Sequence, residues 1–307
     1  MQSVGVIVPR CSAFSAVLAE PQSGTAATAR AWVCLEQPGP WGGDALLESH
    51  LDAELGAELI RRSTGTGVRI LLIRRPGMHA DRHVPQRRRV YLASCAPGAS
   101  WLERADLASP EELLELDFAA LGRGESTGFG EPEAGPLLLV CTNGRRDVCC
   151  ALYGRPIAAE LAERHGDAVW ECTHTGGHRF SPTGVLLPSG YLYGRLDAGF
   201  GDELLAARDV VVQRCRGRSC WSKAGQAAEV AVRVRLGERG DVLAVEPEVR
   251  RDESTWTVGV RHDDGRRWQV VVAERRLPPA RPTSCGKEPA IPTALVVTSV
   301  DQLVPVA

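Results

Sequence analysis

Apolar residues in the first third of the chain fall into short runs separated by amphipathic segments. The runs are rich in β-branched and aromatic residues and predict strands at 30–36, 68–75, 88–95 and 100–107. Apolar positions at helical spacing predict helices at 51–63 and 110–118, the second with Pro110 in its first turn. This order predicts an α/β unit with a βαβ crossover.

A second series of elements follows a segment that cannot form a core. Residues 122–136 are dominated by Gly, Pro, Ser and Glu, so we place a domain boundary there. After it, strands are expected at 136–141, 168–174, 185–188 and 191–196, the last two joined by a hairpin turn at Ser189-Gly190. Helices are expected at 155–166, with Pro156 at the start and Gly166 at the end, and at 201–210. This order is typical of a thioredoxin-like domain, in which a parallel pair precedes an antiparallel pair.

The two series share features that suggest an internal duplication. Each has a strand with Val-Cys near its end, at Val33-Cys34 and Val140-Cys141, and each continues into a helix that contains Ala-Glu-Leu. Two unrelated βαβ units can also share such features by chance. The sequence leaves both interpretations open.

The last region is expected to contain a helix at 221–237 and a hairpin of strands at 254–262 and 266–276, followed by a Pro-rich surface tail from Leu277. The predicted fold class is therefore a mixed α/β fold in the broad sense, with parallel and antiparallel strands as in α+β proteins. We expect an α/β domain over 1–130, which is a degenerate thioredoxin-like domain if the duplication holds. A thioredoxin-like domain is expected over 131–215, and a helix, hairpin and tail over 216–307.

Composition narrows the function classes. The 36 basic and 38 acidic residues give a net charge of −2 without blocks of like charge, which argues against nucleic-acid and membrane-surface partners. No run of 18 apolar residues and no secretory signal pattern is seen, so a cytoplasmic location is expected. Ten cysteines in that setting predict reduced thiols, some of them metal ligands.

Two motifs carry the candidate chemistry, Cys141-Thr-Asn-Gly-Arg-Arg-Asp-Val-Cys149-Cys150 and Cys172-Thr-His174-Thr-Gly-Gly-His178. Each follows a predicted strand, and the carboxyl ends of parallel strands meet at one edge of a sheet. The motifs would therefore bring thiolates and imidazoles together. Cys150 would gain most from the helix dipole, since the loop ends near a helix N-terminus, and Gly176-Gly177 would let both imidazoles face one centre.

Several chemistries fit these ligands. Two Cys and two His suit zinc, but structural zinc sites usually pair cysteines two to four residues apart, whereas eight residues separate Cys141 from Cys150. That longer loop favours an iron-sulfur cluster. Thiol redox chemistry at Cys149-Cys150 and a purely structural role for these residues stay open, although adjacent cysteines form only a strained disulfide.

The two motifs resemble the signature of the sucrase/ferredoxin-like family, with its Cys-x8-Cys and His-x-Gly-Gly-His patterns. The resemblance is strongest over 136–210. It implies a thioredoxin-like ferredoxin domain and a 2Fe-2S cluster, with one iron bound by Cys141 and Cys150 and the other by His174 and His178. Cys149 is an alternative thiolate, but Cys150 keeps the family spacing.

The remaining candidates are assigned structural roles. Cys172 is expected to be a packed thiol. The other six are expected to be buried small hydrophobic residues or incidental thiols: Cys11, Cys34, Cys95, Cys215, Cys220 and Cys285. The arginines beside the motifs are expected either to form ion pairs, for example with Asp147, or to lie near the cluster and dock an acidic partner; they are Arg145, Arg146, Arg179 and Arg195.

The function expected from these observations is electron transfer through a Cys2His2 2Fe-2S cluster. The expected partner is an unidentified redox protein, and no constellation for enzyme catalysis is found. The alternatives are a zinc-stabilised structural or interaction domain and a thioredoxin-like thiol oxidoreductase.

Overall fold

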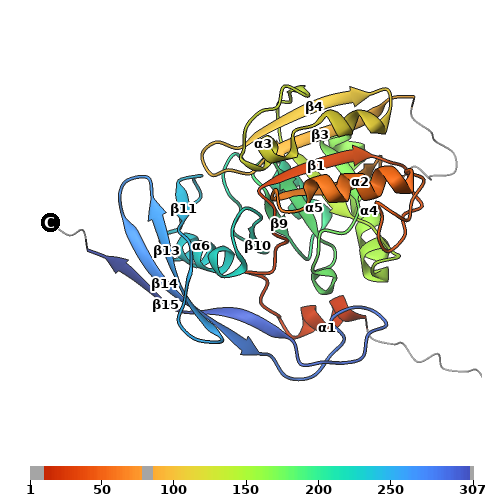
Figure 1. Cartoon of the computed structure of the whole chain (residues 1–307). Helices are drawn as coiled ribbons and strands as arrows, with labels where there is room; N and C mark the ends of the chain where they lie inside the picture. The colour runs from red at the N-terminus through yellow and green to blue at the C-terminus, as the bar shows by residue number, and fades with distance from the viewer. Residues whose placement is uncertain (1–9, 78–85, 305–307) are drawn as a thin grey trace, which may run out of the picture.

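A computed structural model describes residues 10–77 and 86–304 (Figure 1). It is an α+β fold, as expected, with one ten-stranded sheet and one smaller antiparallel sheet. The large sheet contains β1 (Ala31–Glu36), β2 (Val68–Arg74), β3 (Arg88–Ser94), β4 (Trp101–Leu107), β5 (Glu131–Pro132), β6 (Leu137–Cys141), β7 (Val169–Cys172), β8 (Gly184–Leu187), β9 (Tyr191–Tyr193) and β10 (Cys215–Arg218). The helices are α1 (Cys11–Val17), α2 (Ala53–Ser63), α3 (Phe118–Gly122), α4 (Val148–His165), α5 (Ala198–Ala206) and α6 (Lys223–Leu236). Among the described residues, no helix is both long enough and apolar enough to cross a bilayer.

The two halves of the large sheet have the same strand arrangement. The first half is ordered β2-β1-β3-β4 and the second β7-β6-β8-β9. In each half the parallel pair is made by a crossover helix, α2 between β1 and β2 and α4 between β6 and β7, and the remaining pairs are antiparallel. This shared topology is the arrangement that a duplication predicts. The domain limits at 130 and 215 stay a prediction, because the sheet is continuous across the first of them through the β2–β7 pair.

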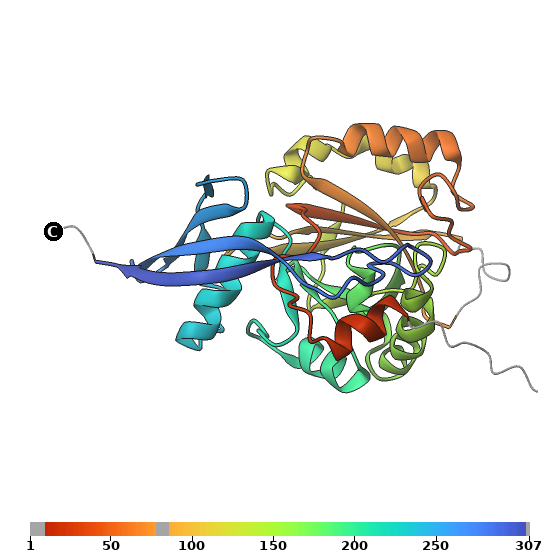
Figure 2. The same cartoon turned by 90° about the horizontal axis from the view of Figure 1, so that it is seen from below.

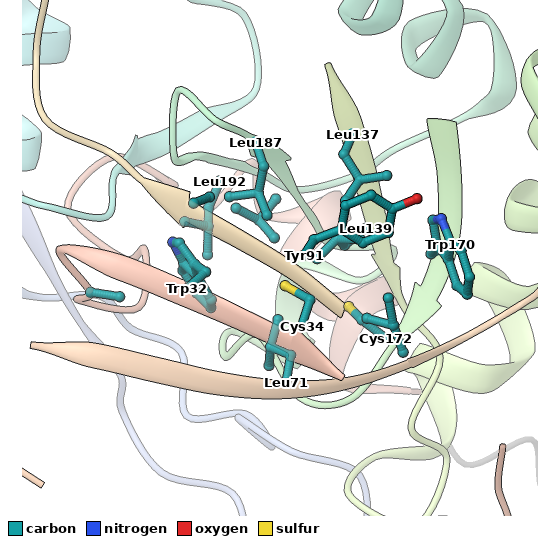
Figure 3. Packing of buried hydrophobic residues seen from close by; sticks show 14 of the residues in the cluster. Trp32, Cys34, Leu71, Tyr91, Leu137, Leu139, Trp170, Cys172, Leu187 and Leu192 are labelled. Atoms are coloured by element: carbon teal, nitrogen blue, oxygen red, sulfur yellow. The ribbon is translucent and has the colours of Figure 1, made fainter. Parts of the chain in front are cut away.

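Helices cover the outer faces of the two half-sheets, and a shared core lies between the inner faces. Figure 2 shows α2 and α3 above the strands and the helices of the second half below them. Figure 3 shows the inner core, to which both halves contribute aromatic and aliphatic side chains. Tyr91 of β3 and Trp170 of β7 meet edge to face there, with ring centroids 5.8 Å apart. Burial of this apolar surface holds the halves together.

Two helix predictions need correction. Residues 110–118 do not form one helix, because a 3-10 helix, η2 (Pro110–Glu115), ends before α3 begins at Phe118. The helix expected from residue 155 begins instead at Val148, where Asp147 caps it by accepting a hydrogen bond from the backbone N–H of Cys149 at 2.9 Å. Pro156 therefore lies inside α4, so it does not mark the helix start.

The surface tail expected from Leu277 is also wrong. Residues Thr293–Leu303 form β15, which pairs along its length with β14 (Arg267–Arg276), and the hairpin partner of β14 is β13 (Thr255–His262), as predicted. The short strands β11 (Leu243–Val245) and β12 (Val249–Arg250) complete the second sheet, and α6 packs on it. The β14–β15 loop returns toward α1 (Figure 1).

A buried polar network joins α6 to the large sheet. The Tyr191 hydroxyl donates to the Glu229 carboxylate, and Arg233 donates to Glu229 Oε1 and to the Tyr191 oxygen at 3.0 Å each. The side chains of Glu229 and Arg233 are fully buried. Arg233 is the cation that compensates the Glu229 carboxylate, and it also donates to the Gly240 carbonyl at 2.8 Å.

We expect Arg233→Met to destabilise the protein by about 3–5 kcal/mol, because it leaves the buried Glu229 carboxylate without its cation. Arg235→Met, at an exposed position of the same helix, is the matched control and should cost less than about 1 kcal/mol. Denaturant unfolding of both variants measures the difference. Equal costs would show that the network does not hold α6 in place.

Candidate metal centre

The two cysteine and histidine motifs leave neighbouring strands at the same edge of the sheet. β6 and β7 are adjacent and parallel, with Cys141 opposite Cys172, and the backbone N–H of Thr142 donates to the Cys172 carbonyl at 3.0 Å. The expected convergence of the two loops is confirmed, and no strand separates them.

Cys141 and Cys150 meet at the start of α4. Both are fully buried, and Cys150 is the third residue of the helix. The pKa of Cys141 lies well below its usual value, because the thiol of Cys150 and the imidazole of His174 both hydrogen-bond to its sulfur. The helix packs tightly here, since a Cβ added at Gly154 would lie 2.5 Å from the carbonyl oxygen of Cys141. The start of α4 therefore places the side chain of Cys150 directly beside that of Cys141.

The histidine loop turns on its two glycines, as predicted. Gly176 and Gly177 have φ values of 81° and 68°, a region that glycine adopts at little cost. The turn stacks the rings of His174 and His178 with centroids 4.8 Å apart. Burial, together with the neighbouring His174, lowers the pKa of His178 to about 4, so this ring is neutral at pH 7 and can act as a ligand.

Both imidazoles have a buried nitrogen without a hydrogen-bond partner among the described residues. These atoms are Nδ1 of His174 and Nδ1 of His178. A buried polar atom left unpaired costs about 1–3 kcal/mol, so two of them side by side need an explanation. The two imidazoles lie near the buried thiol of Cys141. Two imidazoles and two thiols are a donor set that fits a metal or a metal-sulfur cluster.

Two arginines that the motifs did not reveal hold the histidine loop. Arg69 of β2 donates to the carbonyl of His174 at 2.9 Å, and Arg216 of β10 donates to the carbonyl of Gly176 at 2.9 Å. Arg216 is fully buried, and a Cβ at Gly177 would lie 2.2 Å from its Nη2 atom. They lie 105 and 40 residues from their partners in sequence, so no local pattern could have identified them.

A cleft of about 220 Å³ leads to His174. The loop between β1 and α2 forms one wall with Gly43 and Asp44, and Arg69 and Arg146 lie on the other sides. The first half of the sheet thus forms part of the approach to residues supplied by the second half.

A second group of sulfur ligands lies next to the first. Ligand atoms of Cys11, Asp147, Cys149 and Cys285 all lie within 4.8 Å of one another, and this Cys/Asp cluster could bind a metal. Cys11 and Cys285 had been expected to be incidental thiols. Cys149 turns toward this group and Cys150 toward Cys141, so the two adjacent cysteines serve different sites. A vicinal Cys149-Cys150 disulfide does not fit this arrangement.

The other cysteines are packed, as expected for most of them. Cys34, Cys95 and Cys172 are fully buried within the shared core, and burial raises the pKa of Cys95 to about 11. Cys215 lies in the core beneath α4 and α5, and Cys220 is partly buried against the shared core. All ten cysteines are free.

The arginines beside the motifs have different surroundings. Arg179 pairs with Glu20, and Arg195 donates to the carbonyls of Ser15 and Glu20, so both fix the segment that follows α1. Arg145 and Arg146 are exposed. The expected ion pair between Asp147 and one of these arginines is wrong. Asp147 caps α4 and pairs with no arginine among the described residues.

Comparison with known proteins identifies the family of the chain. No curated protein and no solved structure matches the chain at a significant level. The sequence pattern of the sucrase/ferredoxin-like family matches residues 22–215, which include β1 to β9 and both motifs. Because this match spans well over half of the chain, the protein belongs to the sucrase/ferredoxin-like family.

Proposed function

We propose that this protein transfers electrons through a 2Fe-2S cluster held by Cys141, Cys150, His174 and His178. The observation that supports this most is the pairing of two buried thiols with two buried imidazole nitrogens that lack partners among the described residues. A cluster bound there accepts and releases one electron at a time. The assignment of the bound group as a 2Fe-2S cluster, in place of a single metal ion, rests on the family motifs.

The residues around the site would support this role in distinct ways. Asp147 begins α4 and so places Cys150 in the first turn of the helix beside Cys141. The hydrogen bond between the two sulfurs and burial raise the pKa of Cys150, so Cys141 is the thiol that ionises first. Arg69 and Arg216 fix the backbone of the histidine loop and place positive charge near the site. Positive charge nearby favours the reduced form of a cluster.

The cleft at His174 is the proposed place of electron exchange. His174 lines it, whereas Cys141 and Cys150 are fully buried. The exposed Arg146 on its rim would suit an acidic redox partner. Nucleic acids and membranes are not proposed as partners, and we propose a cytoplasmic location.

We expect Cys141→Ser, Cys150→Ser, His174→Ala and His178→Ala each to lose most of the bound iron and acid-labile sulfide. Cys172→Ser and Cys149→Ser should retain both, since their sulfurs lie in the core and in the Cys/Asp cluster. Iron and sulfide assays on freshly purified protein measure this. If Cys150→Ser retained iron and sulfide while Cys149→Ser lost them, Cys149 would be the cluster ligand in place of Cys150.

We expect a midpoint potential between about −150 and +300 mV, well above the roughly −400 mV of all-cysteine plant-type ferredoxins. Neutral imidazoles in place of two thiolates make the cluster less negative and stabilise the added electron. His178→Cys, if it assembles a cluster, should lower the potential. A potentiometric titration that gives a wild-type value near −400 mV would exclude the histidines as ligands.

We expect Gly177→Ala to reduce the iron content strongly, because its Cβ would displace Arg216 and the histidine loop with it. Gly237→Ala is the matched control. Its φ of 67° is close to the 68° of Gly177, but a Cβ there meets nothing within 4 Å. The control should cost about 1–2 kcal/mol of stability and keep its iron. Equal iron in both variants would show that the Arg216 contact does not position the ligands.

A further inference from the structure

Three distant segments bring sulfur atoms together beside the proposed cluster. Cys11 opens α1, Cys149 lies in the first turn of α4, and Cys285 belongs to the β14–β15 loop. Figure 2 shows α1 lying against the second half of the large sheet, with the β14–β15 loop crossing beside it. Cys11 and Cys149 are fully or almost fully buried, and Cys285 is partly buried. Nothing in the proposed electron-transfer site uses these three thiols.

Two of the three sulfur-sulfur distances in this group match those around a single tetrahedral ion, and the third is shorter. The three sulfur-sulfur distances are 3.8 Å for Cys11–Cys149, 3.2 Å for Cys149–Cys285 and 3.6 Å for Cys285–Cys11. The fourth donor, Asp147 Oδ2, lies 3.5 Å from the Cys11 sulfur. A tetrahedral zinc ion with Zn–S bonds of about 2.3 Å separates two sulfurs by about 3.8 Å and a sulfur from an oxygen by about 3.5 Å.

We propose that Cys11, Asp147, Cys149 and Cys285 bind one zinc ion in a closed, structural Cys3Asp site, separate from the electron-transfer site. Three thiolates select a soft or borderline metal, and a tetrahedral sulfur-rich geometry is one that zinc prefers. Four protein ligands leave no open coordination position, which is typical of structural zinc.

The groups around the four ligands are already oriented for such an ion. Asp147 Oδ2 accepts from the Ser284 hydroxyl at 2.9 Å and from the Cys285 backbone N–H at 2.8 Å, and its Oδ1 accepts from the Cys149 N–H. The backbone N–H of Ser12 donates to the Cys149 sulfur, and that of Cys11 to the Cys285 sulfur. Such outer hydrogen bonds orient ligands and spread the negative charge of a metal-thiolate site.

Two other occupants fit the distances less well. A disulfide needs a sulfur-sulfur bond of about 2.05 Å and would join only two of three sulfurs that lie at similar distances from one another. A cluster of several metal ions would spread its ligands over different ions, so the sulfurs would not all lie in contact. One ion uses all four donors at once.

The ion would fasten α1 and the β14–β15 loop beside the histidine loop. Cys11 also approaches the His178 carbonyl, at 4.0 Å. An ionic contact nearby joins the same segments. Glu20 binds Arg179 of the histidine loop through one carboxylate oxygen and Arg281 of the β14–β15 loop through the other. The side chains of Glu20 and Arg281 are almost fully buried. The zinc site and this contact would together hold a cover over the loop that carries His178.

The test is metal analysis of the full-length chain, purified in metal-free buffers from cells grown with zinc and iron. Wild type should carry about one zinc per chain in addition to any iron. Cys11→Ser and Cys285→Ser should lose that zinc and keep their iron, whereas Cys141→Ser should keep zinc and lose iron. Cys220→Ser is the matched control, since this partly buried thiol lies outside both groups, and should keep both metals.

Opposite results separate the two proposals. A wild type without zinc, or zinc that persists in both Cys11→Ser and Cys285→Ser, would overturn the zinc site. A wild-type mass lower by two hydrogens that reductant restores would show a disulfide instead. Failure of the electron-transfer proposal appears separately, as absence of iron and sulfide from a zinc-loaded protein.

A second measurement does not depend on variants folding. After zinc is removed with a chelator, addition of Co²⁺ to the wild type should produce the intense visible bands of tetrahedral cobalt-thiolate coordination, and added Zn²⁺ should abolish them. Weak octahedral bands would contradict the proposed ligand set. In Cys285→Ser, the bands should be weakened, because one thiolate is missing.

Discussion

The pairing of β2 with β7 determines where the candidate site lies. The register of this junction pairs Ile73 with Cys172 and Arg74 with Glu171, and the second pair is a buried ion pair at 2.6 Å. Such a pair offsets its desolvation only with good hydrogen bonds, which Thr142 adds by donating to the same carboxylate at 2.8 Å. The junction places the cysteine and histidine motifs between the two half-sheets. Arg69 and the β1–α2 loop can therefore reach residues that the second half supplies.

The sequence predicted local features well and long-range contacts poorly. Strand positions followed from apolar runs such as 137–141, and the convergence of the two motifs followed from the geometry of parallel strands. Pro156 misled the helix prediction because the capping residue, Asp147, lies eight residues before the expected start at 155. The meeting of Cys11 with Cys285 spans 274 residues and depends on the complete fold, which no periodicity encodes. The shared order of the two series was visible in the sequence, but only the structure shows that the strands of each half are arranged alike in the sheet.

The first turn of α4 allows adjacent residues to serve different sites. Successive side chains on a helix point about 100° apart, since 3.6 residues make a turn. Cys149 therefore faces α1 and the β14–β15 loop, while Cys150 faces Cys141. Asp147 connects the two functions, because it caps the helix and also accepts from Ser284 and Cys285. A change at Asp147 would therefore affect both sites through the helix terminus.

The position of Cys285 late in the chain has a consequence for assembly during translation. The 106 residues from 179 to 284 separate the histidine motif from Cys285. At ~5–20 residues per second, the ribosome needs roughly 5–20 s to synthesise them. During that interval the nascent chain already contains both motifs but lacks the loop that lies beside them in the finished fold. If the proposed 2Fe-2S cluster is bound, iron and sulfide would meet least obstruction in this interval. The timing of translation would then set how many chains receive the cluster before the loop of Cys285 is in place.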